Sequence, residues 1–227
     1  MAYTNKPYTF AFQSWAFFGL CISVATNASQ LNVDDPSIAE HCELQLGWQQ
    51  PRSDHSAKQI NGSGTCNTGQ WEWHLGIEQQ SNNAINEQQT ELGFKLPLNA
   101  DYAPWQSALA VNLQKNHQGS HPLTTQIVGI LGYDLAAQNL RLYSNLGIDQ
   151  YGAQSPQLIA GVAIAFEYDT EQQWIAEFYR HESHERTYKL AYQYLLKRQL
   201  QLQLSLGNSL KGNTQQLGAD FTFFFNY

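Results

Sequence analysis

Ionisable and amide side chains recur at every second position in several stretches of this 227-residue sequence. The set comprises Glu72, His74, Glu91, Lys95, Arg141, Asn145, Glu167, Glu177, Lys189 and Gln193. Carboxylates, cations and amides can hydrogen-bond a polar solute, and they can equally pair with one another. If their common face lines an enclosed interior, we expect solute contact or mutual pairing there, and both interpretations stay open.

A second group, His181 to His184, contains the residue types of a serine hydrolase. Some membrane barrels hydrolyse lipids with a Ser, a His and an acidic residue on adjacent strands. Here the cluster falls in a predicted loop between two strands, beside Glu185 and Arg186. This position favours a solvated polar loop over a catalytic site. Two His three positions apart could bind zinc, but no third ligand is evident. We therefore predict no enzyme, no metal and no cofactor, with an outer-membrane lipid hydrolase as an alternative.

The polar set lies on segments in which apolar and polar residues alternate, the pattern of β-strands with one apolar face. In the first such segment Trp71, Trp73, Leu75 and Ile77 lie opposite Glu72, His74, Gly76 and Glu78. The alternation recurs over residues 91–96, 105–114, 140–149, 161–167, 174–178, 188–194 and 200–206. Residues 123–134 are apolar at both sets of positions, so the sequence does not assign their sides.

A soluble sandwich would show the same alternation, but further features favour a barrel in a membrane. Aromatic rings stand near strand ends on the apolar faces, as at Trp71, Trp105 and Trp174, where a bilayer interface would lie. The polar faces mix Gln and Glu with Gly and Ala, which suits a wet lumen better than a dry core. A soluble exported ligand carrier is an alternative that would need the apolar faces inside.

The C-terminal strand, residues 216–227, is the sharpest motif. It places Gly218 ahead of Phe221, Phe223, Phe225 and Tyr227 at alternate positions. This arrangement resembles the sorting signal of bacterial outer-membrane barrels, which implies the barrel-assembly machinery as a partner and outer-membrane lipids around the four rings. The terminal edge strand of a soluble sheet is the other interpretation, but such edges are normally blunted by charge or Pro.

Residues 1–28 predict a cleavable signal peptide. Lys6 precedes the apolar stretch 15–25, and small residues follow before Ser29. The apolar stretch is too short for a helix that crosses a bilayer, which needs about 20 residues. The mature chain would therefore be exported to the bacterial outer membrane.

An N-terminal segment over residues 29–69 is predicted to carry a disulfide between Cys42 and Cys66, because an exported chain enters an oxidising compartment. The composition also limits the partners. Only 14% of the residues are charged and the formal net charge is -7. A chain of this kind has no basic surface for nucleic acid, so we expect none as a partner.

Residues 70–227 are expected to form an all-β, antiparallel up-and-down transmembrane β-barrel of about ten strands, with twelve as the alternative. The number should be even because both termini of bacterial barrels lie on one side. Short turns at 136–139, 170–173 and 196–199 would share that side, and connections at 150–157, 182–186 and 208–213 the other. An extra strand at 44–48 breaks the even count, unless a weak strand at 31–38 makes twelve or the Cys42–Cys66 element is periplasmic.

Short strand-like phrases carry a family resemblance: residues 71–78 (WEWHLGIE), 91–98 (ELGFKLPL), 140–148 (LRLYSNLGI), 174–178 (WIAEF) and 217–227. In these phrases the chain resembles the outer-membrane barrels linked to the meta-cleavage pathway of phenol degradation, often labelled transporter-like. The resemblance implies a channel or transporter for small solutes, hydrophobic or aromatic ones among them. It also singles out Asn145 and Glu177 as solute contacts. A structural barrel without transport is the alternative.

Overall fold

The structure, a computed structural model, describes residues 33–37, 39–51, 58–81, 86–99, 104–117, 123–180, 186–209 and 214–225. The predicted signal peptide, residues 1–28, lies outside the described residues. The hydrolase-like cluster His181 to His184 and the C-terminal Tyr227 lie outside them too. No helix in the described ranges is long and apolar enough to cross a membrane.

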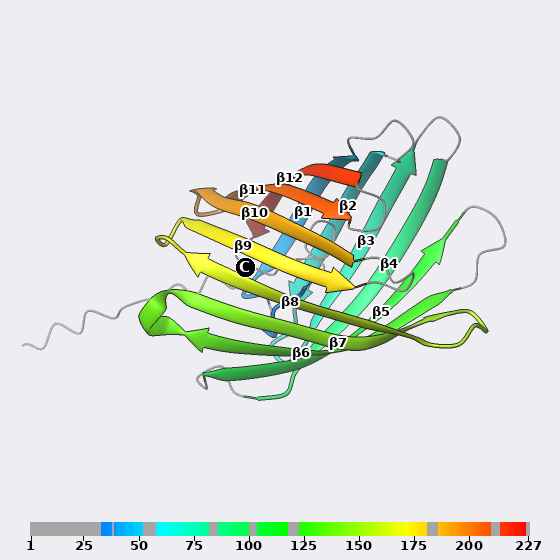
Figure 1. Cartoon of the computed structure of the whole chain (residues 1–227), viewed down its shortest axis with the longest axis horizontal. Helices are drawn as coiled ribbons and strands as arrows, with labels where there is room; N and C mark the ends of the chain where they lie inside the picture. Colours follow the sequence, from blue (N-terminus) through cyan, green and yellow to red (C-terminus); the bar gives the residue numbers. More distant parts are fainter. Residues whose placement is uncertain are drawn as a thin grey trace, which may run out of the picture.

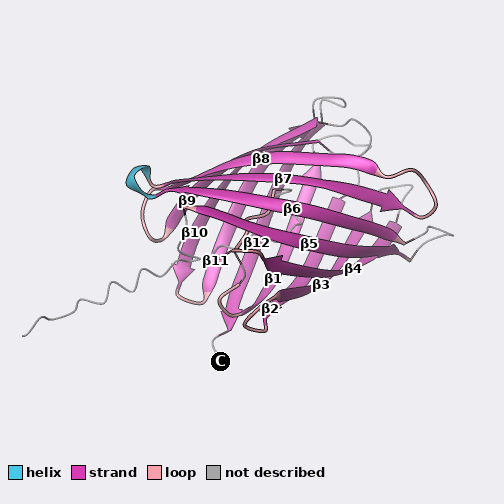
Figure 2. Ribbon diagram, turned by 90° about the horizontal axis from the view of Figure 1, so that it is seen from below, coloured by secondary structure: helices cyan, strands magenta, loops and turns pink. Residues whose placement is uncertain are grey.

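The described chain forms a closed barrel in which every strand is antiparallel to both of its neighbours (Figures 1 and 2). Its strands are β1 (Cys42–Pro51), β2 (Lys58–Asn67), β3 (Glu72–Ser81), β4 (Asn86–Pro97), β5 (Trp105–Asn116), β6 (Thr124–Leu135), β7 (Leu140–Tyr151), β8 (Gln157–Glu167), β9 (Gln172–Arg180), β10 (Arg186–Lys197), β11 (Leu200–Ser209) and β12 (Thr214–Phe225). A short 3-10 helix, Ala136–Gln138, joins β6 to β7. Strands that are consecutive in sequence are neighbours in space, and β12 pairs with β1 to close the ring.

The barrel therefore has twelve strands, the alternative count, rather than about ten. Strands β1 and β2 come from the segment that the sequence placed ahead of the barrel, so the barrel begins at Cys42 and not at residue 70. Strand β2 gives no apolar alternation because Gly62 and Gly64 occupy two of its outward positions. The weak strand expected at 31–38 is wrong, since the described residues 33–37 adopt no strand.

Burial along the strands is inverted relative to a soluble protein. Leu146 is 59% exposed on the outer surface, whereas its neighbour Asn145 is 7% exposed and faces the lumen. The predicted division of faces is confirmed. It extends into residues 123–134, where Ile127 and Leu131 are exposed while Val128 and Ile130 are buried inside. An apolar outer surface and a polar interior are the arrangement of a barrel that crosses lipid.

Aromatic pairs gather on the outside at the end of the barrel where β1 begins and β12 ends. Trp105 packs on Tyr133 with ring centroids 4.4 Å apart, and Trp174 packs on Tyr192 at 4.8 Å. A third pair joins Trp71 to Phe94 at 5.5 Å. Aromatic rings near the end of a barrel suit the interface between the hydrocarbon and the headgroups of a bilayer.

The same end of the barrel carries the predicted short turns. Residues 136–139, 168–171 and 198–199 connect their strands there, and the strand ends Tyr151, Arg180 and Ser209 lie at the opposite end. Cys42 and Cys66 form the predicted disulfide, which joins the start of β1 to the end of β2. This bond ties the first strand to its neighbour at the point where the chain enters the barrel wall.

Candidate functional site in the barrel lumen

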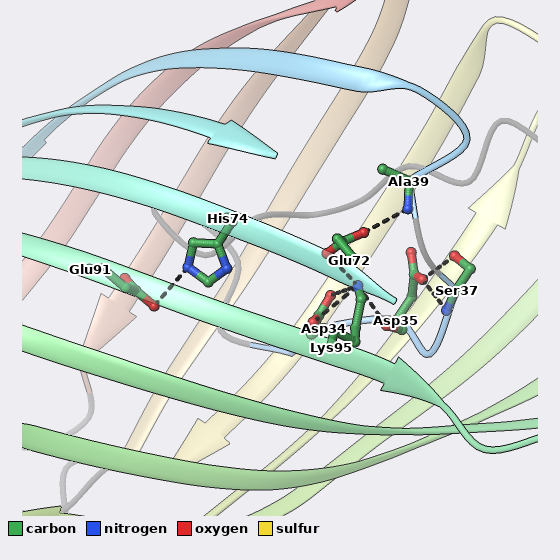
Figure 3. Close-up of polar contacts among 8 residues, drawn as sticks. All are labelled: Asp34, Asp35, Ser37, Ala39, Glu72, His74, Glu91 and Lys95. Carbon is green, nitrogen blue, oxygen red and sulfur yellow. Dashed lines mark hydrogen bonds and ion pairs between the residues drawn. The ribbon is translucent and has the colours of Figure 1, made fainter. Parts of the chain in front are cut away.

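A described stretch of the chain ahead of β1 lies inside the barrel (Figure 3). We call residues 33–37 and 39 the lumenal segment. Val33 is 3% exposed, Asp35 5% and Ala39 2%, because the inner faces of the strands surround them. The segment contacts strands from β3 to β9, so it occupies the lumen across about half of the wall.

Two inward side chains in the middle of the wall hold the backbone of the lumenal segment. Glu177 on β9 accepts a hydrogen bond from the Val33 N–H at 3.0 Å. The Asn145 amide on β7, turned with its oxygen toward the segment's N–H, accepts from Asp34 N at 2.7 Å and donates to Asp34 O at 3.0 Å. Asn145 thus satisfies both backbone groups of Asp34, as a neighbouring strand would.

A buried lysine holds the segment nearer the end of the barrel where β1 begins and β12 ends (Figure 3). Lys95 Nζ lies 3.3 Å from Glu72 Oε1 and 3.4 Å from Asp34 Oδ1, and it also reaches the Asp35 carbonyl at 3.5 Å. The second oxygen of Glu72 accepts the Ala39 N–H at 2.6 Å. Removing one partner of such a buried pair leaves an uncompensated charge, so these groups act as a unit.

Two inward glycines make room for the lumenal segment. A Cβ added at Gly161 on β8 would lie 2.6 Å from Val33 Cγ2, and one at Gly132 on β6 would lie 2.7 Å from Pro36 Cγ. Real side chains do not approach so closely, so both positions must lack a Cβ for the segment to lie where it does. The wall is therefore shaped to its occupant as well as bonded to it.

Other members of the predicted polar set pair with each other across adjacent strands. His74 Nε2 on β3 lies 3.1 Å from Glu91 Oε1 on β4, with the imidazole directly over Gly93. Arg141 Nη2 on β7 lies 2.6 Å from Glu167 Oε1 on β8. These pairs match the mutual-pairing interpretation of the polar face.

Lys189 and Gln193 lie on the inner face of β10, next to β9. Lys189 is directly across from Glu177 and interacts electrostatically with it and with Asp220. The Gln193 amide donates to Gln203 Oε1, and Gln203 in turn donates to Asp220 Oδ2 at 3.2 Å. A chain of amides and carboxylates thus crosses three strands, β10 to β12.

All of the predicted polar residues lie on the inner face, and the structure divides them by what they touch. Glu72, Lys95, Asn145 and Glu177 converge on the lumenal segment, whereas His74 pairs with Glu91 and Arg141 with Glu167. Contact with a solute stays a prediction for each of them.

The sequence analysis did not identify three carboxylates that lie inside the lumen: Asp34, Asp35 and Asp220. Asp34 and Asp35 fall in the stretch 31–38, for which the sequence offered only a weak strand. Asp220 stands among the aromatic residues of the sorting strand, where its even position could have placed it inside, opposite Phe221 and Phe223. No group of three or more His, Cys, Asp or Glu that could hold a metal ion occurs in the described ranges.

One strip of the lumen wall is apolar. Its members are Ala108, Ala110, Val128, Ile130 and Ile159, all buried, on β5, β6 and β8. A second apolar group, on β8 to β10, packs around Val33 of the lumenal segment. The interior is thus polar on most sides, with one wall that an apolar solute could contact.

No family model matches the sequence, and no curated protein matches it. Among solved structures the chain is similar to the KdgM porin, with a TM-score of 0.67 and 7% identity over 81% of this chain and 99% of that one. It is also similar to an outer membrane channel from Pseudomonas putida F1 (TM-score 0.58, 11% identity, coverage 88% and 100%). Outer membrane phospholipase A from Escherichia coli is a further neighbour (TM-score 0.54, 7% identity, coverage 89% and 96%). The TM-scores establish a shared barrel fold, which porins and a phospholipase have in common.

Proposed function

We propose that the protein is an outer-membrane channel for small solutes. The observation that carries the proposal is the inverted barrel, in which exposed leucines such as Leu146 cover the outside and buried polar groups such as Asn145 line the inside. A bilayer accepts the outer surface, and a closed ring of strands leaves no unpaired backbone edge within it. The enclosed polar interior then offers a path from one end to the other.

The route to the membrane is part of the same proposal. A signal peptide over residues 1–28 would direct export, and the C-terminal strand with Phe221, Phe223 and Phe225 on its outer face would engage the barrel-assembly machinery. Phe221 and Phe225 are exposed, 43% and 49%, which supports their contact with lipid. We infer the outer membrane of a bacterium as the location.

The solutes are proposed to be small because the lumenal segment fills part of the interior. The apolar strip that includes Val128, Ile130 and Ile159 supports solutes with an apolar or aromatic body. Phenolic compounds fit this description, and the proposed link to phenol degradation rests on the sequence resemblance.

The experiment is conductance of the refolded protein in planar bilayers, combined with liposome swelling in neutral solutes of graded size. A channel should give discrete current steps and should admit small phenols faster than sugars of larger cross-section. Intact bilayers without current and liposomes without swelling would show a structural barrel instead. Phospholipid hydrolysis by the wild type that is lost in Ser183→Ala would favour the hydrolase alternative.

A further inference from the structure

The lumen of this barrel holds more negative than positive side chains. Among the described residues, the cations buried or half-buried on the inner face are Lys95, Arg141 and Lys189. Inward carboxylates outnumber them, and two further carboxylates, Asp34 and Asp35, enter with the lumenal segment. A solute inside the barrel therefore meets a predominantly negative wall.

Each of the three lumenal cations faces carboxylates that offset its charge. Lys95 lies within 3.4 Å of carboxylate oxygens of both Glu72 and Asp34. Arg141 is 2.6 Å from Glu167, and Lys189 interacts with Glu177 and Asp220. Since the positive groups are matched locally, an anionic solute finds little compensation for its loss of water.

Carboxylates beyond these pairs are spread over several strands. They are Glu43 on β1, Glu78 on β3, Glu87 and Glu91 on β4, and Asp149 on β7. Their partners are neutral or weakly basic where the structure gives them: Gln80 donates to Glu78, Asn116 donates to Glu87, and His74 lies against Glu91. The hydrogen bonds from the neutral amides of Gln80 and Asn116 orient Glu78 and Glu87 without cancelling their charge.

Two buried amide oxygens add an independent observation. Gln173 on β9 and Gln193 on β10 lie directly across from each other, 7% and 3% exposed. The Oε1 atom of each has no hydrogen-bond partner within the described part of the chain. A buried acceptor without a partner costs free energy, and an ammonium group or another donor that came within hydrogen-bond distance would satisfy it.

We propose that the lumen selects cations over anions, and that small organic amines with an apolar body are preferred solutes. The proposal rests on the proposed channel function and names the class of solute. Charge selection follows because low-dielectric walls focus the field of the carboxylates along the path, as acidic linings do in cation channels. The apolar strip on β5, β6 and β8 offers a surface for the rest of the molecule.

Reversal potentials in a KCl gradient test the selectivity of the wild-type channel. We expect K⁺ to permeate several-fold better than Cl⁻. Glu78→Gln together with Glu87→Gln should lower that ratio by about half, because the substitutions remove two lumenal charges and keep the side-chain shape. Glu171→Gln removes one charge from an exposed turn and should leave the ratio unchanged.

The same bilayers can compare two organic ions of matched size under bi-ionic conditions, benzylammonium against benzoate. We expect benzylammonium to permeate faster. Open channels with a K⁺ to Cl⁻ ratio near one, a preference for Cl⁻ or faster passage of benzoate would overturn the charge selection and leave the channel function standing. Absence of any current would overturn the channel function, and the charge selection with it.

Discussion

Asn145 on β7 and Asp34 ahead of β1 pair as two peptide groups would, through hydrogen bonds of 2.7 and 3.0 Å. The two residues are far apart in sequence, so the pairing exists only in the folded chain. The backbone of Asp34 has no strand partner, and the Asn145 side chain supplies its hydrogen bonds instead. The lumenal segment is therefore an element of the folded barrel and not a linker that leads to it.

Asn145→Leu should loosen the lumenal segment while the barrel stays folded. Leu is close to Asn in size but satisfies neither the N–H nor the C=O of Asp34, a loss of about 1 to 3 kcal/mol for each buried group left unpaired. A cysteine introduced as Ser37→Cys should then react faster with a maleimide. Asn112→Leu is the matched control, because Asn112 faces the lumen and bonds Gln126 instead. Equal labelling in both backgrounds would show that Asn145 does not hold the segment.

Gly161→Ala should displace the lumenal segment through steric overlap, without removing any hydrogen bond. Its methyl group would lie 2.6 Å from Val33 Cγ2 and 2.8 Å from Tyr179 Cδ2. Gly129→Ala is the control, because its methyl group meets nothing closer than 3.6 Å. We expect faster labelling of Ser37→Cys in the first variant and wild-type rates in the second. Wild-type rates in Gly161→Ala would mean that Val33 does not lie against β8.

Leu146→Arg tests the outer surface. Leu146 is 59% exposed and stands in the middle of β7, so the cation would face the hydrocarbon near the bilayer midplane and cost about 2 to 4 kcal/mol. The measurement is the temperature at which the folded, fast-migrating form is lost on gels without boiling. Arg at a half-buried inward position away from the lumenal segment, as Asn112→Arg, should be better tolerated. The opposite order would reverse the inside and outside faces.

The final strand offers a test of assembly. Phe225→Ser combined with deletion of Tyr227 should reduce membrane assembly far more than Phe224→Ser, since Phe225 is 49% exposed on the outer face and Phe224 stands at an inward position. Heat-modifiable protein in the membrane fraction measures the outcome. Similar losses in both variants would show that the outward row of aromatic rings is not what the assembly machinery reads.

The faces of most strands could be predicted from the sequence because each strand alternates strictly between lipid and lumen. The pair Asn145 and Leu146 shows the rule, and the disulfide between Cys42 and Cys66 followed from composition and compartment. Strand β2 could not be predicted, because Gly62 and Gly64 remove the apolar signal from its outer face. Without β2 the strand at 44–48 made the count odd, so it was left out of the barrel and the prediction stayed at about ten.

The lumenal segment could not be predicted either, for a different physical reason. The sequence offered only a weak strand at 31–38, and nothing local indicates that these residues are buried. The side chains that hold the segment come from strands far along the chain. Glu177, for example, accepts a hydrogen bond from Val33, which lies 144 positions earlier. The alternation of apolar and polar residues predicts which face of a strand meets lipid, but it does not predict which segment fills the lumen.

Single-channel conductance of the wild type against Asn145→Leu combined with Glu177→Leu tests the central claim most directly. The claim is a solute path through the lumen that the lumenal segment narrows. We predict small discrete steps in the wild type and larger steps in the double variant, which loses the hydrogen bonds to Val33 and Asp34. Both proteins should remain heat-modifiable. Folded barrels that carry no current in either form, or identical steps in both, would contradict the account.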